Sequence, residues 1–516
     1  MHPLALVRCV AVLAAFMLPL TLPVARAADA MPAGIVWKQA ADIDAAFAEA
    51  RQQNKPLFLY WGAVWCPPCN QVKATVFSRA DFIERSRLFV PVYVDGDAPA
   101  AQRLGSRFKV SAYPTMLLLR PDGSEITRLP GEVDPDRYMQ VLQQGINGGR
   151  PVKALLTSAQ SGKAALGATD WQRLAFYSWW TDDQSLLPRA ERASALWALA
   201  GKSQTAAPDA SARLALTAAA MAAADKNTTL DKRALLQRVR AVLADPRVSR
   251  AAFAEIRNAA GSVPGYLTEA GSAERGALVQ QWDRRLTQLA ADSQLSRLDR
   301  IAATDARVAL ARLDAPKGPL PLALQTEVRA VTLRAEREVT DRYEREAVVF
   351  ASSQVLADAG LLDESDAMLR AELKRSATPY YHMLGLASNA RKRGDTPAAL
   401  SWYEQAYATS QGPATRLQWG ASYVRALIDL APTDAERIER AARSVIGELA
   451  PTAETFHARN RSVLDRMGAR LNDWNKDGRN DAALTRLRTQ LGAICAQLPA
   501  QAPERSTCND ALTKKG

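Results

Sequence analysis

The sequence predicts an α/β domain followed by a large all-α region, and three observations lead to this fold class. Residues 35–146 alternate between short apolar runs of strand length and segments with apolar residues at helical spacing, which is typical of a central sheet with helices on both faces. Residues 150–516 are rich in Ala, Leu, Arg, Glu and Gln, and strand-like alternation is scarce there. The run Gly145-Ile146-Asn147-Gly148-Gly149 separates these two parts.

The expected elements of the first part can be placed along the chain. Apolar residues at helical spacing predict a helix over Asp42–Gln52, with Asp42 as its N-cap, and a final helix over Asp134–Ile146. Four apolar runs have the length and composition of strands, and a Pro-Asp-Gly-Ser hairpin turn separates the last two. These runs are Leu57–Trp61, Leu88–Val94, Met116–Leu119 and Ile126–Leu129.

The all-α part contains an internal repeat. Gly394 follows Gly360 at the same interval at which Pro413 follows Pro379. The interval, about 34 residues, and the residue types resemble tetratricopeptide repeats, in which helix pairs stack because one pair cannot bury its own apolar face. An irregular helical bundle with a chance coincidence is the alternative. The expected organisation is a signal peptide over 1–27, an α/β domain over 28–146, a linker over 147–150, a helical region over 151–345 and a tetratricopeptide-like region over 346–516.

The N-terminus has the pattern of a signal peptide. Met1–Arg8 is short and positively charged, and Cys9–Leu22 is an apolar run too short for a comfortable membrane span. Small residues precede a cleavage point near Ala27/Ala28. We therefore expect export to the periplasm with residues 1–27 removed, and no transmembrane segment after that removal. An uncleaved membrane anchor is the alternative.

The charge pattern indicates a globular protein without a nucleic-acid site. The chain has 516 residues and a net charge of +12, from 66 Lys and Arg and 54 Asp and Glu. Removing residues 1–27 takes away Arg8 and Arg26 and no acids, which leaves 64 basic against 54 acidic side chains, or +10. Charges of both signs are interspersed, and no basic stripe with interleaved aromatics occurs. We therefore expect solvated helix faces and no nucleic-acid partner.

Four of the five cysteines lie outside the predicted signal peptide, and their spacing divides them into two pairs. Cys66 and Cys69 form a tight C-x-x-C, whereas Cys495 and Cys508 are more widely spaced and lie near the C-terminus. The second pair is expected to form a structural disulfide worth about 3 kcal/mol; a second redox pair is the alternative. With only three histidines, the sequence favours no metal site, and it indicates no cofactor.

The C-x-x-C pair lies where a strand, a short turn and a helix meet. This arrangement places Cys66 at or just before a helix N-terminus, where unpaired N–H groups favour a thiolate. The thiolate is the nucleophile of disulfide exchange. Cys69 lies one turn deeper on the same face, so it can attack a mixed disulfide on Cys66 and release the partner. A permanent disulfide that merely braces this junction is the alternative interpretation.

Two motifs resemble the thioredoxin superfamily. Trp65-Cys66-Pro67-Pro68-Cys69 is similar to its W-C-x-x-C site, and Tyr113-Pro114-Thr115 is similar to its cis-proline loop. The surrounding segments resemble the branch that includes the C-terminal domain of the membrane reductase DsbD. The resemblance implies that Cys66 and Cys69 are catalytic, that Pro114 is cis, and that Trp65, Tyr113, Pro114 and Thr115 contact the client.

The sequence departs from the family pattern at two positions. Tyr60 stands where thioredoxins often have a buried Asp that relays protons for the second cysteine, and Lys73 stands where the DsbD-like branch often has an acid. Proton removal from Cys69 is therefore left to water, Lys73 or another group. Pro67 and Pro68 lack N–H groups that could stabilise the Cys66 thiolate, so we expect a moderately to strongly reducing pair.

The sequence therefore predicts an exported thiol–disulfide oxidoreductase whose helical half selects protein clients and whose electrons come from a membrane donor of the DsbD type. A helical-repeat scaffold with a peptide-recognising domain is one alternative. A disulfide isomerase or oxidase, which would use the same residues, is another. The aromatic pair Trp179-Trp180 is interpreted as core packing.

Overall fold

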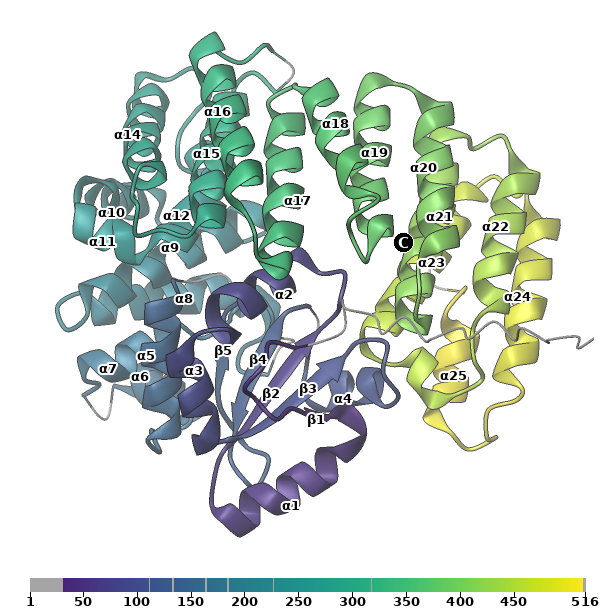
Figure 1. Ribbon diagram of the computed structural model, residues 1–516, viewed down its shortest axis with the longest axis horizontal. Helices are drawn as coiled ribbons and strands as arrows, with labels where there is room; N and C mark the ends of the chain where they lie inside the picture. The colour runs from purple at the N-terminus through teal and green to yellow at the C-terminus, as the bar shows by residue number, and fades with distance from the viewer. Residues whose placement is uncertain are drawn as a thin grey trace, which may run out of the picture.

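A computed structural model of the chain describes residues 31–110, 112–131, 134–162, 165–182, 185–225, 227–316 and 318–513 (Figure 1). The predicted signal peptide, residues 1–27, and its expected cleavage point lie outside these ranges. Across the described residues no helix has both the length and the apolar character needed to cross a membrane.

The α/β part is built on a five-stranded sheet with the strand order β1-β3-β2-β4-β5. β3 runs parallel to β1 and β2, whereas β4 is antiparallel to both β2 and β5. The strands are β1 (Lys38–Gln39), β2 (Leu57–Gly62), β3 (Val90–Asp95), β4 (Thr115–Leu119) and β5 (Glu125–Leu129). All four predicted strand runs are therefore confirmed, and β1 is an additional strand.

Both faces of this sheet are covered, which explains why every residue of β2 is buried. Leu57, Leu59 and Trp61 point to one face, which α1 and α4 cover, while Phe58 and Tyr60 point to the other, which α2, α3 and α5 cover. The helices of the domain are α1 (Ile43–Gln53), α2 (Pro67–Val72), α3 (Ala80–Arg85), α4 (Ala101–Arg107) and α5 (Pro135–Ile146).

The two predicted helices of the domain are confirmed, but only one has the expected kind of cap. Asp134 accepts the N–H groups of Asp136 and Arg137 at the start of α5. Asp42 occupies the N-cap position of α1, as predicted, but its side chain accepts no N–H group of the helix. A short 3-10 turn over Ala40–Asp42 leads into α1 and gives Asp42 a backbone conformation outside the extended region that capping residues adopt.

The remainder of the described chain is helical, and we refer to residues 151–516 as the helical half. The predicted fold class, an α/β domain followed by an all-α region, is therefore confirmed. Its helices are α6 (Val152–Ser161), α7 (Ala168–Ala175), α8 (Arg189–Ser203), α9 (Pro208–Ala224), α10 (Lys232–Ala244), α11 (Pro246–Ala251), α12 (Phe253–Ala259), α13 (Val263–Leu267), α14 (Ala273–Ala290), α15 (Arg297–Arg312), α16 (Leu322–Glu338), α17 (Arg342–Asp358), α18 (Leu362–Glu372), α19 (Pro379–Arg393), α20 (Thr396–Thr409), α21 (Pro413–Leu430), α22 (Ala435–Gly447), α23 (Ala458–Trp474), α24 (Asp481–Cys495) and α25 (Pro503–Asp510).

The repeat found in the sequence corresponds to successive helix pairs. Gly360 and Gly394 both adopt a left-handed backbone, with φ of +85° and +78°, in the turns that precede α18 and α20. Pro379 and Pro413 are the first residues of α19 and α21. The helices of this region stack on their neighbours as pairs. The assignment to tetratricopeptide repeats stays a prediction.

The helical half curves around the α/β domain as an arc (Figure 1). α17 packs on α2, and α23 packs on α4 at the opposite flank of the domain. The predicted linker at 147–150 joins α5 to α6, but one hydrophobic core continues across it, from Leu142 to Leu155 and into the helical half. The helical half is therefore packed directly against the end of the sheet that carries Cys66.

Candidate active site around Cys66 and Cys69

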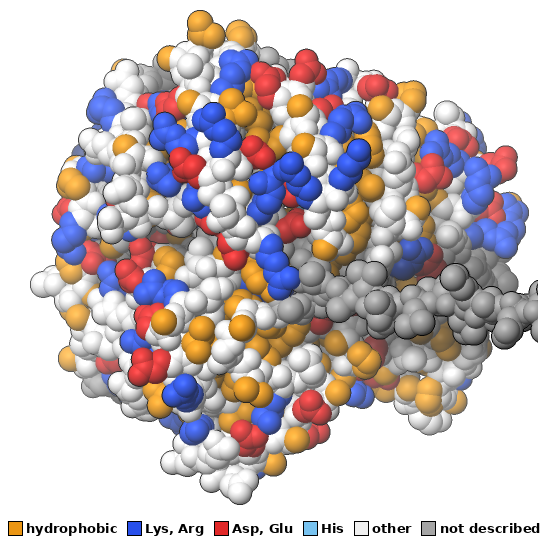
Figure 2. Space-filling view, viewed as in Figure 1, with side chains coloured by type: hydrophobic (Ala, Val, Ile, Leu, Met, Phe, Trp, Pro, Cys, Tyr) orange, Lys and Arg blue, Asp and Glu red, His pale blue; other side chains and the backbone are white. Residues whose placement is uncertain are grey.

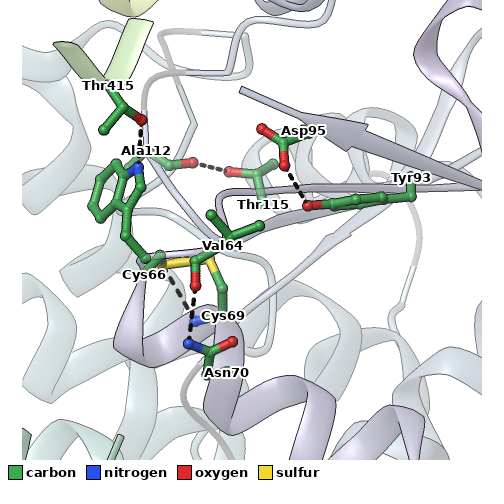
Figure 3. The surroundings of a disulfide bond; sticks show 10 residues. Val64, Cys66, Cys69, Asn70, Tyr93, Asp95, Ala112, Thr115 and Thr415 are labelled. Atoms are coloured by element: carbon green, nitrogen blue, oxygen red, sulfur yellow. Dashed lines mark hydrogen bonds between the residues drawn. A yellow bond between two sulfur atoms is a disulfide. The ribbon is translucent and has the colours of Figure 1, made fainter. Parts of the chain in front are cut away.

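Cys66 and Cys69 lie at the junction of β2 and α2 and are joined by a disulfide (Figure 3). Cys66 is the N-cap of α2, and its Sγ accepts the backbone N–H of Cys69 at 3.2 Å. Pro67 and Pro68 occupy the first two positions of the helix and have no N–H to donate. A single N–H donor of the first turn therefore reaches the Cys66 sulfur.

The loop before β4 places a cis proline beside this pair. The Tyr113–Pro114 peptide bond is cis, as the family resemblance implied. Thr115 begins β4, pairs with Trp61 of β2, and donates its hydroxyl to the carbonyl of Ala112 at 2.7 Å. Gly131 must be small, because a side chain there would meet Pro114 Cγ at 2.6 Å. The two sequence motifs, which are well separated along the chain, therefore meet at one end of the sheet.

A cavity of about 460 Å³ lies between Pro114 and the helical half. Its wall on the side of the α/β domain includes Pro68, Tyr113, Pro114 and Gly131. Its opposite wall includes Tyr177, Trp179, Trp180 and the α9 residues Leu216, Ala220 and Ala224. Trp180 is 55% exposed at this cavity, whereas Trp179 is 2% exposed. The prediction that both tryptophans pack in the core was therefore right for Trp179 and wrong for Trp180.

A buried arginine of β5 anchors the segment that carries Trp180. Arg128 donates to the carbonyl oxygens of Thr181 at 2.7 Å and Lys109 at 2.8 Å. The N–H of Ser178 donates back to the Arg128 carbonyl at 2.9 Å. The turn at residues 176–181 is thus attached to the edge of the sheet, and this fixes the helical wall of the cavity relative to Pro114.

The other side of the pair, at Trp65, is enclosed by the helical half. The Trp65 indole N–H donates to Thr415 Oγ1 at 2.7 Å, and Figure 3 shows Thr415 entering on a helix from outside the α/β domain. The Trp65 ring stacks on Tyr381 with centroids 5.7 Å apart and meets the ring of Trp419 at 4.7 Å. Trp65 is consequently buried, so its indole is not available to a client in this conformation.

Asp97 strengthens this enclosure. Its carboxylate accepts the backbone N–H of Thr415 at 2.8 Å and also the Thr415 hydroxyl. Burial raises the pKa of Asp97 to about 6, and the nearby charge of Asp95 raises it further, while the hydrogen bonds from Thr415 oppose the shift. Asp97, Thr415 and Trp65 thus form one hydrogen-bonded chain between the two halves.

A guanidinium from α23 completes the enclosure. Arg459 lies 4.9 Å from the Tyr113 ring and 5.7 Å from the Trp65 ring. Its Nε and Nη2 both donate to the neutral Oε1 of Gln418, at 2.8 and 2.6 Å. Burial lowers the pKa of Arg459 below its ordinary value. The Trp65 side of the site therefore has a cation from the helical half next to the rings of Trp65 and Tyr113.

The two positions that depart from the family pattern lie behind the disulfide. Tyr60 is completely buried, and burial followed by the charge of Asp95 raises the pKa of Tyr60 far above its ordinary value. The Lys73 ammonium lies 5.9 Å from the Tyr93 ring and 5.3 Å from the Tyr343 ring. Tyr343 belongs to α17, so the helical half also contributes to the surroundings of the buried sulfur.

Solvent reaches the pair poorly: Cys66 is 3% exposed and Cys69 is 0% exposed. The cavity is lined by Pro68, which lies between the two cysteines in the sequence, and by Pro114, but by neither cysteine. Charges over the face drawn in Figure 2 are of both signs and intermixed, so this face has no single-sign field that would steer a client.

Cys495 and Cys508 lie far from this site in the sequence and form a disulfide that joins the end of α24 to α25. Both residues are buried. Throughout the described ranges, no group of three or more His, Cys, Asp and Glu side chains is arranged to hold a metal ion.

Comparison with known proteins supports the fold of the first part. Residues 43–146 match the family model described as a thioredoxin-like domain. The chain is 34% identical over 122 residues to the thiol:disulfide interchange protein DsbD of Pseudomonas fluorescens, covering 23% of this chain and 21% of the relative. It is 35% identical over 102 residues to DsbD 1 of Pseudomonas aeruginosa, covering 18% and 17%. The chain thus matches about a fifth of the length of these relatives.

A solved structure is also similar to this part. The solution structure of a proposed disulphide-isomerase from Bacteroides thetaiotaomicron is 26% identical, covers 23% of this chain and 99% of its own, and has a TM-score of 0.21. By the family model and the DsbD relatives, residues 43–146 are a thioredoxin-like domain with a C-x-x-C pair, similar to a region of DsbD and followed by a large helical region.

Proposed function

We propose that this protein is an exported thiol–disulfide oxidoreductase that acts on protein clients in the periplasm. One observation carries the proposal: a C-x-x-C pair at the first turn of a helix lies beside the Pro114 loop and its cavity, in a domain similar to part of DsbD. A brace that only held β2 to α2 would need neither this loop nor a cavity beside it.

The exchange proceeds in two displacement steps. In the reduced protein the Cys66 thiolate attacks one sulfur of a client disulfide, a Cys66–client disulfide forms, and the second client sulfur leaves as a thiolate that takes a proton from water. The Cys69 thiolate then attacks the Cys66 sulfur, the Cys66–Cys69 disulfide forms, and the first client sulfur leaves. Two electrons pass from the protein to the client, so a dithiol donor must reduce the pair again.

We infer the direction of transfer from the hydrogen-bond donors around Cys66. Only the Cys69 N–H reaches the Cys66 sulfur from the first helical turn, because Pro67 and Pro68 have none. Fewer donors mean a less stabilised thiolate and a more reducing pair. We propose that the protein reduces its clients and is itself reduced by a membrane donor of the DsbD type. A reduction potential near that of DsbA, about −120 mV, would contradict this and favour an oxidase.

The helical half is proposed to select clients through the cavity beside Pro114. Trp180 offers an exposed aromatic ring next to the client position, and α9 offers small side chains opposite it. An aromatic anchor beside a narrow cavity suits an extended client segment better than the surface of a folded domain.

The first test is reduction of insulin disulfides by the full-length purified protein. Wild type is expected to reduce insulin, and Cys66→Ser is expected to lose all of this activity. Cys69→Ser should stop at the mixed disulfide, and proteins trapped on Cys66 in cells would identify the clients. The double variant Cys495→Ser/Cys508→Ser is the control, because it removes both cysteines outside the site without leaving an unpaired thiol and should leave the exchange rate unchanged.

A binding protein is the second candidate, and the burial of Trp65 favours it. The ring that would contact a client is occupied by Tyr381 and Trp419 of the same chain. A helical-repeat scaffold whose thioredoxin-like domain is a docked structural unit would have this property. Normal function of Cys66→Ser in cells would support the scaffold and contradict the enzyme.

A further inference from the structure

The hydroxyl of Tyr60 is buried without a partner. Its ring packs against Phe77 at 4.8 Å, Tyr93 at 5.3 Å and Trp37 at 6.0 Å, all aromatic neighbours. Within the described part of the chain, no atom forms a hydrogen bond with the Tyr60 hydroxyl. A phenylalanine would fill the same space without this cost, because a buried donor that has lost water and gained no partner destabilises the fold.

This hydroxyl and the sulfur of Cys69 lie on either side of Gly62's missing side chain. A side-chain carbon placed on Gly62 would lie 2.6 Å from the Tyr60 hydroxyl oxygen and 3.4 Å from Cys69 Sγ. The oxygen and the sulfur therefore border the same small space, the one that a side chain at position 62 would occupy. Glycine at this position keeps the space between them free.

The redox state of Cys69 decides whether the hydroxyl has a partner. In the disulfide, Cys69 Sγ is a neutral sulfur and a weak hydrogen-bond acceptor. In the reduced protein it is free to rotate, and as a thiolate it becomes a charged acceptor. Cys69 is completely buried, so water cannot supply this hydrogen bond in place of the protein.

We propose that the Tyr60 hydroxyl donates a hydrogen bond to the Cys69 sulfur in the reduced protein and so stabilises the thiolate that performs the second step of exchange. This assignment rests on the proposed function. Tyr60 acts as a positioning and stabilising donor and keeps its own proton. The step starts from the Cys69 thiolate: the Cys69–Cys66 bond forms, the bond between Cys66 and the client sulfur breaks, and the client leaves as a thiolate that takes a proton from water.

The surroundings of the Tyr60 hydroxyl favour a role as hydrogen-bond donor over a role as base. Burial and the neighbouring carboxylate raise the pKa of Tyr60, which keeps its hydroxyl protonated at any pH at which the protein works. Elements packed around this point contribute further charged or titratable groups. They are Lys73 of the π-helical turn Lys73–Phe77, Tyr93 and Asp95 of β3, Tyr138 of α5 and Tyr343 of α17.

The test compares Tyr60→Phe with Tyr138→Phe in the full-length protein. Tyr138 is another buried tyrosine of the same core, but its hydroxyl contacts Met116 Sδ at 3.1 Å. In a Cys66→Ala background, Cys69 is the one thiol of the site, and its thiolate absorbance is titrated with pH. Tyr60→Phe is expected to raise the pKa of Cys69 by about one unit, and Tyr138→Phe to leave it unchanged.

A kinetic readout completes the test. In protein with both cysteines, Tyr60→Phe should slow release of a peptide from the Cys66 mixed disulfide about tenfold near neutral pH, and the first attack should keep its rate. An unchanged Cys69 pKa in Tyr60→Phe, or an equal shift in Tyr138→Phe, would overturn the assignment. A wild-type protein that forms no mixed disulfide would instead refute the proposed function, while the titration would still decide the role of Tyr60.

Discussion

The helical half packs closely against one side of the region around Cys66 and Cys69 and leaves a cavity on the other side. On the Trp65 side it supplies Tyr381, Trp419 and Thr415, which bury the indole and hold it by a hydrogen bond. On the Pro114 side it leaves a cavity of about 460 Å³, and the exposed Trp180 ring lies at the wall of this cavity. The comparison teaches that the helical half shapes the surroundings of the candidate site, because it encloses Trp65 on one side and lines the cavity at Pro114 on the other.

The largest expected effect on the free energy of unfolding comes from removing a side chain that encloses Trp65. Trp419→Ala deletes a buried ring that contacts Trp65 and the Tyr380 ring, so it should lower the free energy of unfolding by about 3–5 kcal/mol. It should also speed alkylation of Cys66 in the reduced protein. Trp402→Ala, on the half-buried ring of α20, is the control and should change neither to this extent. Equal alkylation rates in the two variants would mean that Trp419 does not restrict access.

The hydrogen-bonded chain between the halves should contribute less. Thr415→Val leaves the Trp65 indole without its acceptor and Asp97 without the donated Thr415 hydroxyl, and should cost about 1–3 kcal/mol of unfolding free energy, measured by chemical denaturation. Thr489→Val is the matched control, since the exposed Thr489 hydroxyl donates to the Thr485 carbonyl of its own helix. If Thr415→Val loses no more unfolding free energy than the control, these hydrogen bonds do not stabilise the packing of the two halves.

On the open side the effect should fall on binding alone. Trp180→Ala should raise the KM for extended peptide clients about tenfold, a change of about 1.4 kcal/mol, and leave kcat unchanged. Because Trp180 is 55% exposed, the free energy of unfolding should change by less than about 0.5 kcal/mol. Leu333→Ala, at a residue 53% exposed on α16, should alter neither quantity. An unchanged KM in Trp180→Ala would show that clients do not use this wall.

A separate effect is a pH dependence of stability that comes from Asp97. Burial raises its pKa from an ordinary value of 3.8 to about 6, so the folded protein binds more protons than the unfolded chain between these two values. Stability should therefore fall as pH rises from about 4 to about 6 and then lose this dependence. Asp97→Asn should flatten the slope of unfolding free energy against pH in this window. A slope that persists in Asp97→Asn would assign it to other groups.

The sequence could predict those parts of the structure that depend on a few consecutive residues. The buried strand before Cys66, the turn between β4 and β5, and the two motifs at Cys66 and Pro114 each occupy a few consecutive residues. Together they predicted the fold class and the place of the C-x-x-C pair. The sequence could not tell that Trp179 is buried and Trp180 exposed. Helical periodicity no longer applies to these residues, because α7 ends at Ala175.

The enclosure of Trp65 had no local signal. Trp65 and Thr415 are 350 residues apart in the sequence, and the hydrogen bond between them depends on how the helical half curves around the domain. Arg459 and Arg128 likewise look like ordinary surface cations in the sequence, since the rings and carbonyl groups that surround them come from distant elements. Arg128 is buried where the turn at residues 176–181 meets the carbonyl groups of Phe108 and Lys109.

The most direct test of the central claim is reaction of Cys66 in folded Cys69→Ser protein with a peptide whose single cysteine carries an activated disulfide. The account predicts one peptide per chain, attached to Cys66, formed more slowly in a Trp180→Ala background and at an unchanged rate in Leu333→Ala. A Cys66 that reacts only after the protein is unfolded would contradict it.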